Sequence, residues 1–290
     1  MTGPEGAPVI VFIHGLGLSR KIWDPFLPNF EGCRVVNYDL YGHGESAPPS
    51  DVASLRVYSD QLAGLLRHLG IAKASVIGFS IGGMINRRFA LDHGEMLDRL
   101  VILNSPHDRG EEAQAKVEAR AAKVREQGAF ATMDAALKRW FTPKCLSESQ
   151  QKMSPRHEGG EDAVGPARGG GSGGSRATGA SANYLSSSPP AEVIDWRSQV
   201  DAESYAQAAW VLANGVRELI APEPPITVPT LVMTCENDVG STPTMSRAIA
   251  AEIPGTELHI VPGLKHLGLM ERPDSFTVPL LTFLAAQNAA

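Results

Sequence analysis

Short apolar runs alternate along this chain with longer stretches in which apolar residues recur at helical spacing. The runs are PVIVFI (8–13), CRVVNY (33–38), ASVIGF (74–79), RLVILN (99–104), TLVMTC (230–235) and ELHIV (257–261). Uninterrupted apolar runs rich in β-branched residues are typical of strands buried on both faces of a sheet, which we expect of the first two in particular. The pattern therefore predicts strands at all these positions.

The stretches between the runs predict helices. Between residues 62 and 69, leucines recur at the i, i+3, i+4 and i+7 positions of one helix face, and Gly70 can end that helix. Further helical patterns cover 81–93, 242–252 and 274–286. Strands that alternate with helices build a parallel sheet with helices on both faces. We therefore predict an α/β fold with a mostly parallel, doubly wound sheet.

The middle of the chain, from about residue 107 to 225, has no comparable buried strand. Helical patterns rich in Ala, Glu, Lys and Arg cover 111–127 and 129–141, and another covers 202–219. We interpret this region as a helical cap inserted between two halves of one sheet. The predicted divisions are a first core part at 1–106, the cap at 107–225 and a second core part at 226–290.

One stretch of the predicted cap, residues 154–184, has an unusual composition. Between residues 159 and 179 it holds nine glycines and one large apolar residue, Val164. Such a segment buries too little apolar surface to offset the entropy of ordering it, and its GGGSGGS portion resembles a flexible linker. We expect this stretch to be disordered.

Composition narrows the class of protein. The chain has 290 residues, of which 43% are hydrophobic and 20% charged, typical of a globular protein with a sizeable core. Its net charge of −6 gives no basic footprint for nucleic acid. The three cysteines show no metal or disulfide spacing, and no metal cluster stands out among the histidines and acids, so we expect free thiols, no metal and no cofactor.

The N-terminus lacks a basic segment, and its apolar run at 9–13 is too short for a signal peptide or a membrane span. We expect a cytoplasmic location and no membrane partner. The oligomeric state stays open.

Ser80 lies between two glycines in VIGFSIGGMI (76–85), after a predicted strand and before a predicted helix. This is the context of a nucleophile elbow, G-x-S-x-G, in which a strained turn lifts the serine hydroxyl above a sheet. Gly78 and Gly82 stand where side chains would clash in such a turn. A serine hydroxyl also needs a base and an orienting acid before it becomes a good nucleophile.

Two residues late in the chain fit those roles. His266 follows the last predicted strand after a short loop, where its ring can reach Ser80 as the base. Asp238 follows the strand at 230–235 in a loop, and we favour it as the acid over Glu236, which lies nearer the strand end. The backbone N–H groups of Leu16, in HGLG (14–17), and of Ile81 are the candidates for an oxyanion hole.

Other polar and aromatic residues have competing interpretations. His14 and His43 belong to HG and GHG turns, where histidines more often hold loops than perform chemistry. His107 lies just past a strand end, where pockets form in open α/β sheets, and it either lines the site or is structural. Trp23 and Trp140 are candidates for pocket walls or for ordinary aromatic packing.

Several motifs carry a resemblance to the α/β-hydrolase superfamily. They are HGLG (14–17), DLYGHGES (39–46), GFSIGG (78–83), ENDVGST (236–242) and KHLGLMERP (265–273). Within the superfamily, GFSIGGMINRRFALDH and VILNSP are similar to the 3-oxoadipate enol-lactonase branch and its ester-cleaving and lactone-cleaving relatives. The resemblance implies an α/β-hydrolase fold with a helical cap and a triad in the chain order Ser80, Asp238, His266.

These observations predict a serine hydrolase that cleaves a lactone or a small carboxylic ester through an acyl-enzyme on Ser80. Three alternatives stay open: a carbon–carbon bond hydrolase of ring-cleavage products, a cofactor-free perhydrolase, and a non-catalytic ligand receptor on the same fold. Turnover separates an enzyme from a receptor.

Overall fold

The structure, a computed structural model, describes residues 1–153 and 188–285. Its strands are β1 (Val9–Ile13), β2 (Arg34–Tyr38), β3 (Ala74–Phe79), β4 (Leu97–Leu103), β5 (Thr230–Cys235) and β6 (Glu257–Val261). They form one sheet in the order β2-β1-β3-β4-β5-β6, and every neighbouring pair of strands is parallel. The predicted α/β fold with a parallel sheet is confirmed.

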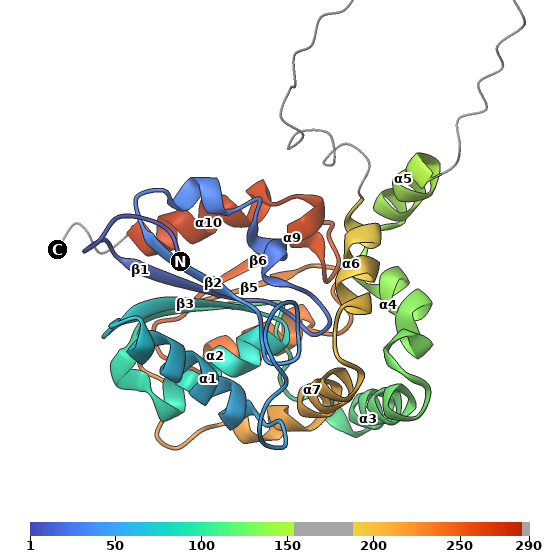
Figure 1. Cartoon of the computed structure of the whole chain (residues 1–290), viewed down its shortest axis with the longest axis horizontal. Helices are drawn as coiled ribbons and strands as arrows, with labels where there is room; N and C mark the ends of the chain where they lie inside the picture. The colour runs from blue at the N-terminus through green and yellow to red at the C-terminus, as the bar shows by residue number, and fades with distance from the viewer. Residues whose placement is uncertain (154–187, 286–290) are drawn as a thin grey trace, which may run out of the picture.

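Successive side chains of a strand point to opposite faces of the sheet, and both faces here are apolar. Each face is therefore covered by helices. Val11 lies in the apolar cluster of one face, whose helices are α1 (Leu55–His68), α2 (Ile81–Asp92) and α8 (Pro243–Glu252). Phe12 lies in the cluster of the other face, whose helices are α10 (Asp274–Ala285) and the short 3₁₀ helices η1 (Arg20–Trp23) and η2 (Leu27–Phe30). In Figure 1 the sheet separates α1 and α2 from α10.

The described chain between β4 and β5 is helical. We call its α-helices the cap helices: α3 (Gly110–Gln127), α4 (Met133–Trp140), α5 (Pro143–Met153), α6 (Pro189–Ser198) and α7 (Ala202–Asn214). Helices α3 and α7 pack together through small apolar residues, among them Ala121, Val124 and Ala209. Figure 1 shows the cap helices grouped on one side of the sheet and its covering helices. The stretch predicted to be disordered, 154–184, lies outside the described residues.

The cap differs from the sequence prediction in detail. The helix predicted over 129–141 divides into η4 (Ala129–Thr132) and α4, and the one over 202–219 divides into α7 and η5 (Gly215–Leu219). Helices α5 and α6 were not predicted. Helix α6 begins at two prolines, which in a sequence resemble a loop. Proline nevertheless suits the first turn of a helix, because the N–H that it lacks would have no partner within the helix.

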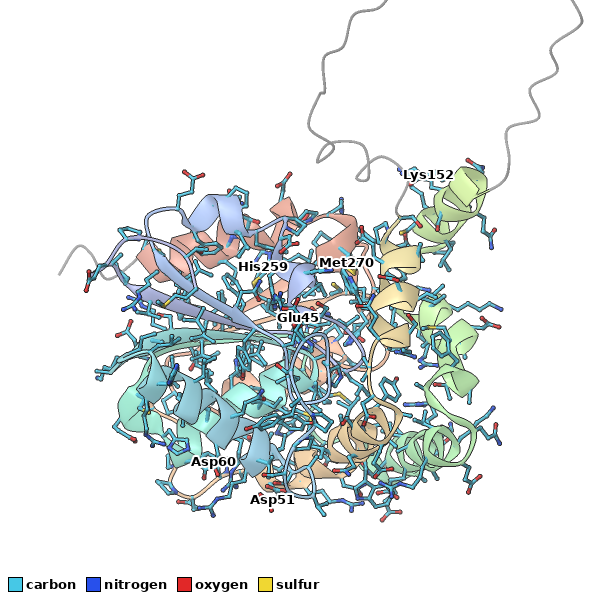
Figure 2. The ribbon with its side chains drawn as sticks, in the orientation of Figure 1. Glu45, Asp51, Asp60, Lys152, His259 and Met270 are labelled. Carbon is cyan, nitrogen blue, oxygen red and sulfur yellow. The ribbon has the colours of Figure 1, made fainter. Side chains whose placement is uncertain are left out.

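Strand β2 also departs from its prediction as a strand buried on both faces. Only its second and third residues are buried, because it forms an edge of the sheet and has one neighbouring strand. The opposite edge strand, β6, is more exposed still, and His259 projects from it at the surface (Figure 2). Among the described residues, no helix is long and apolar enough to cross a membrane.

Candidate active site

Ser80 occupies a strained turn between β3 and α2. Strand β3 ends at Phe79, helix α2 begins at Ile81, and Ser80 between them has a φ of 58° and a ψ of −115°. A positive φ is rare for a residue with a side chain and persists only where the surroundings enforce it. The turn brings backbone close together: a Cβ added to Gly78 would lie 2.1 Å from the carbonyl oxygen of Gly82. The two glycines thus permit the turn that presents the serine hydroxyl.

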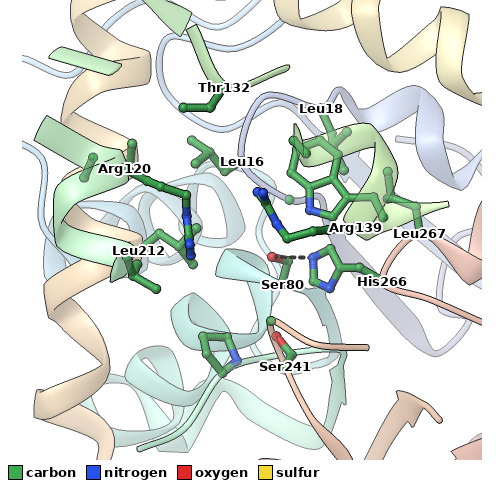
Figure 3. Close-up of a pocket in the computed structure, with 18 of the residues that line it drawn as sticks. Leu16, Leu18, Ser80, Arg120, Thr132, Arg139, Leu212, Ser241, His266 and Leu267 are labelled. Atoms are coloured by element: carbon green, nitrogen blue, oxygen red, sulfur yellow. Dashed lines mark hydrogen bonds between the residues drawn. The ribbon is translucent and has the colours of Figure 1, made fainter. Parts of the chain in front are cut away.

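His266 lies beside that hydroxyl. It follows β6 in a loop, and its Nε2 atom is 3.1 Å from Oγ of Ser80, the contact drawn as a dashed line in Figure 3. Its Nδ1 atom is 2.6 Å from Oδ2 of Asp238. A carboxylate accepts hydrogen bonds only, so Nδ1 carries a proton and donates it, which leaves the Nε2 lone pair facing the serine. The structure therefore brings Ser80, His266 and Asp238 together in one chain of hydrogen bonds.

Four donors surround the Asp238 carboxylate. Oδ1 accepts hydrogen bonds from the backbone N–H groups of Gly240 (2.8 Å) and Ser241 (2.9 Å), and Oδ2 accepts from His266 and from Nδ2 of Asn104 (2.9 Å). Burial of this side chain favours the neutral acid, but His266 and the hydrogen bonds outweigh that effect and lower the pKa of Asp238 below its usual value. Asp238 is therefore a fixed negative charge beneath the imidazole.

Sequence reasoning missed Asn104. It follows β4 directly, at the same edge of the sheet as Ser80 and Asp238, and its backbone has a φ of 46°. This conformation turns the buried amide toward Asp238. The signal that could have identified it is a polar residue directly after a buried strand that neighbours the strand carrying the nucleophile.

Two neutral histidines hold the HGLG loop. The backbone N–H of Gly17 donates to Nε2 of His43 (3.1 Å), and that of Leu40 donates to Nε2 of His14 (3.0 Å). Burial lowers the pKa of both imidazoles, that of His43 to about 3. The interpretation of these histidines as loop-holding residues is confirmed. With the Gly17 N–H engaged, the N–H of Leu16 carries no hydrogen bond within the described chain.

A pocket opens above Ser80 between the sheet edge and the cap helices. Its walls include Leu16, Leu212 and His266, which are labelled in Figure 3. Trp140 and Asp238 also line it. Trp140 is thus a pocket wall, as one of its two interpretations held.

The other candidate residues lie elsewhere. Trp23 is buried against Phe12 in the core, His107 pairs with Glu252 at 2.9 Å, and Glu236 accepts a hydrogen bond from the backbone N–H of Gly263. No group of three or more His, Cys, Asp or Glu side chains able to hold a metal occurs in the part of the chain that the structure describes.

Four arginines also line the pocket, and sequence reasoning missed all of them. They are Arg109, Arg120, Arg139 and Arg197, and all belong to the chain between β4 and β5. In the sequence they are indistinguishable from the charged residues that face water on any amphipathic helix. Surface charges such as Asp51, Asp60 and Lys152, by contrast, lie on the outside of the molecule in Figure 2.

Comparison with known proteins agrees with this architecture. The 3-oxoadipate enol-lactonase 2 of Acinetobacter baylyi is 32% identical over 150 residues, 51% of this chain and 55% of that protein, so the match spans about half the relative's length. The 3-oxoadipate enol-lactonase 1 of the same organism is 24% identical over 284 residues, 95% of this chain and 88% of that protein.

Among solved structures, the enol-lactonase from Burkholderia xenovorans LB400 superposes with a TM-score of 0.76 at 26% identity, covering 97% of this chain and 94% of that one. A sequence model of the family described as alpha/beta hydrolase fold matches residues 8–273. This chain belongs to the α/β-hydrolase family.

Proposed function

We propose that this enzyme is a serine hydrolase that cleaves a lactone or a small carboxylic ester through an acyl-enzyme formed on Ser80. One observation carries the proposal: the hydrogen-bonded series from Ser80 through His266 to Asp238, set on a strained turn at the floor of a pocket. That series supplies a nucleophile, a base that contacts it and an acid that orients the base.

In the first half of the reaction, Oγ of Ser80 attacks the carbonyl carbon of the substrate while Nε2 of His266 takes the hydroxyl proton. The imidazolium that forms is stabilised by the ionised Asp238. His266 then returns the proton to the departing oxygen, and the C–O bond breaks. In a lactone that oxygen stays attached to the acyl group, so the opened ring remains bound to Ser80.

In the second half, His266 takes a proton from a water molecule, whose oxygen attacks the acyl carbon. The tetrahedral intermediate then collapses: its bond to Oγ of Ser80 breaks, His266 returns the proton to Oγ, and the acid leaves. The negative oxygen of both tetrahedral intermediates needs hydrogen-bond donors, and we assign the N–H groups of Leu16 and Ile81 to it. Ile81 is the first residue of α2, so its N–H has no acceptor within the helix. Losing one such donor typically costs about 3–4 kcal/mol of transition-state stabilisation.

The substrate class rests on the relatives, two of which are named enol-lactonases. The cap helices shape the pocket, and we propose that residues 107–225 act as the cap over a core formed by 1–106 and 226–290. We also propose a cytoplasmic location, since all three cysteines are free thiols, as is usual in a reducing compartment.

The test is acid release, followed with a pH indicator, from a panel of lactones, enol-lactones and short-chain esters. Wild type, Ser80→Ala and the surface control Ser50→Ala are measured side by side. The proposal expects turnover by wild type and Ser50→Ala and none by Ser80→Ala. Equal turnover by all three proteins would contradict it. Absence of turnover on every member would move the assignment to carbon–carbon bond cleavage, perhydrolysis or a receptor role.

A further inference from the structure

The charges that face the pocket do not balance. Its described lining holds four arginines and a single acidic residue, Asp238, whose carboxylate is already committed to His266, Asn104 and two backbone N–H groups. Burying a cation without a partner is costly. An anion that binds in this pocket from outside the chain would offset that cost.

One of the four arginines has partners of its own. The Arg109 guanidinium donates to the carbonyl oxygens of Leu212 and Ala213 and to the side chain of Gln114. It thereby fastens the start of α3 to the end of α7. Arg109 is a structural cation, and the imbalance rests on the other three.

Arg197 is the most deeply buried of these three. It is 1% exposed, and its guanidinium lies between two rings, 5.0 Å from the centroid of Trp140 and 4.9 Å from that of Tyr205. The rings hold the group flat, yet Nε and Nη2 have no hydrogen-bond partner in the described chain. Nη1 reaches only the carbonyl oxygen of Ala129, at 3.5 Å. Nε and Nη2 are buried as well as unpartnered, so Arg197 adds a positive charge at the pocket wall that no group of the described chain neutralises.

Arg120 and Arg139 complete the group. Both are half-buried, and neither forms a hydrogen bond or an ion pair within the described chain. Figure 3 shows their side chains entering the pocket from two cap helices, α3 and α4, above Ser80. Burial lowers the pKa of Arg120, and the nearby Arg139 lowers it further, which indicates that like charges gather here without compensation.

We propose that Arg120, Arg139 and Arg197 form a carboxylate-binding site, through which the enzyme selects lactones or esters that carry negative charge over neutral ones. Guanidinium groups suit this role because their planar donors match the two oxygens of a carboxylate. Three cations without anionic partners match a substrate with two free carboxylates better than a substrate with one. This inference rests on the proposed function, since it assigns the substrate of the Ser80 site.

The test uses esters that share one leaving group and differ in charge: p-nitrophenyl butyrate, mono-p-nitrophenyl succinate and the mono-p-nitrophenyl ester of tricarballylate. We expect kcat/KM to rise in that order, by about tenfold or more for each carboxylate. A second pair, phenyl butyrate and 4-carboxyphenyl butyrate, distinguishes a charge in the alcohol part from one in the acyl part. Preference for the charged member of either series supports the proposal, and equal or better cleavage of the neutral esters in both overturns it.

Variants then locate the preference. Arg120→Gln and Arg139→Gln should each lower the ratio of charged to neutral kcat/KM about tenfold, chiefly through a higher KM for the charged esters. Arg125→Gln removes the same charge from the exposed face of α3 and should leave the ratio unchanged. If Arg125→Gln lowers the ratio as much as the other two variants, the effect is one of overall charge and the assignment to these arginines is wrong.

A binding measurement separates this inference from the proposed function. Titration of tricarballylate into Ser80→Ala by calorimetry should show binding that Arg139→Gln weakens about tenfold in the same background, whereas the neutral triamide should not bind. Binding without Ser80-dependent turnover would preserve the anion site and reject the hydrolase mechanism. Ser80-dependent turnover without anion binding, and without preference for charged esters, would support the hydrolase mechanism and reject the anion site.

Discussion

The loops at the sheet edge and the cap helices differ in whether their buried charged side chains have partners within the chain. At the sheet edge, Asp238 is enclosed by four hydrogen-bond donors, all from the chain itself. In the cap, Arg197 is as deeply buried but has donors without a hydrogen-bond partner, and Arg120 and Arg139 have no anionic partner in the described chain. The network around Asp238 is fully hydrogen-bonded before substrate binds. The arginines of the cap, by contrast, gain their partners only when a substrate binds.

This difference predicts that damage to the sheet edge affects every substrate, and that damage to the cap affects charged substrates selectively. The largest effect is expected for Asp238→Asn. An amide at this position can donate to Nδ1 of His266, which favours the imidazole tautomer with its proton on Nε2, facing the serine. We expect kcat to fall by about 10⁴ for charged and neutral esters alike.

Steady-state kinetics on the three p-nitrophenyl esters checks this prediction. Circular dichroism and the urea midpoint serve as controls for folding. A loss of activity confined to the charged esters would mean that Asp238 acts as the cap arginines are expected to act, and it would contradict the comparison.

The next effect concerns the histidines that hold the HGLG loop. Because burial depresses the pKa of His43 to about 3, the unfolded chain, with an ordinary histidine pKa near 6.5, binds a proton that the folded chain excludes throughout the range between them. Stability is therefore lost as the pH falls through this range, by up to about 1.4 kcal/mol per pH unit for each such histidine. His14, whose pKa burial also lowers, adds to the loss.

Urea unfolding at pH 7, 6, 5 and 4 measures this dependence. His43→Gln should reduce the slope of unfolding free energy against pH by about one proton, whereas His259→Gln, at an exposed position, should leave it as in wild type. A wild-type stability that is flat from pH 7 to 4 would mean that the loop does not depend on neutral imidazoles.

A smaller effect is expected at Asn104, which links the two neighbouring strand ends. Asn104→Ala removes one of four donors to the Asp238 carboxylate, and we expect kcat/KM to fall about tenfold to thirtyfold, equally for charged and neutral esters. The same variant should shift the acid limb of the profile of kcat/KM against pH towards higher pH. The reason is that the Asn104 hydrogen bond helps to lower the pKa of Asp238. An unchanged rate and profile would show that Asn104 merely fills space.

The sequence allowed prediction of the parts that depend on local constraints. The Ser80 turn was predictable because a strained strand-to-helix turn demands glycines at fixed offsets, and these glycines stand beside the serine. Asp238 and His266 were predictable as loop residues after the strands β5 and β6, since parallel strands place their carboxyl ends at one edge.

What the sequence concealed depends on tertiary packing. The orientation of Asn104 follows from a backbone conformation that no motif specifies. The arginines escaped prediction because periodicity assigns cations on helices to water, and only the placement of α3, α4 and α6 around one pocket turns three of them inward.

The most direct test of the account is to identify the residue that becomes covalently modified. A fluorophosphonate reacts with the nucleophile of a serine hydrolase, and trypsin should release the labelled peptide 74–87, ASVIGFSIGGMINR, in which fragmentation distinguishes Ser80 from Ser75. The account predicts one label, on Ser80, lost in His266→Ala and accompanied by complete loss of hydrolysis. Continued hydrolysis by fully labelled enzyme, or a label on another residue that abolishes hydrolysis, would contradict it.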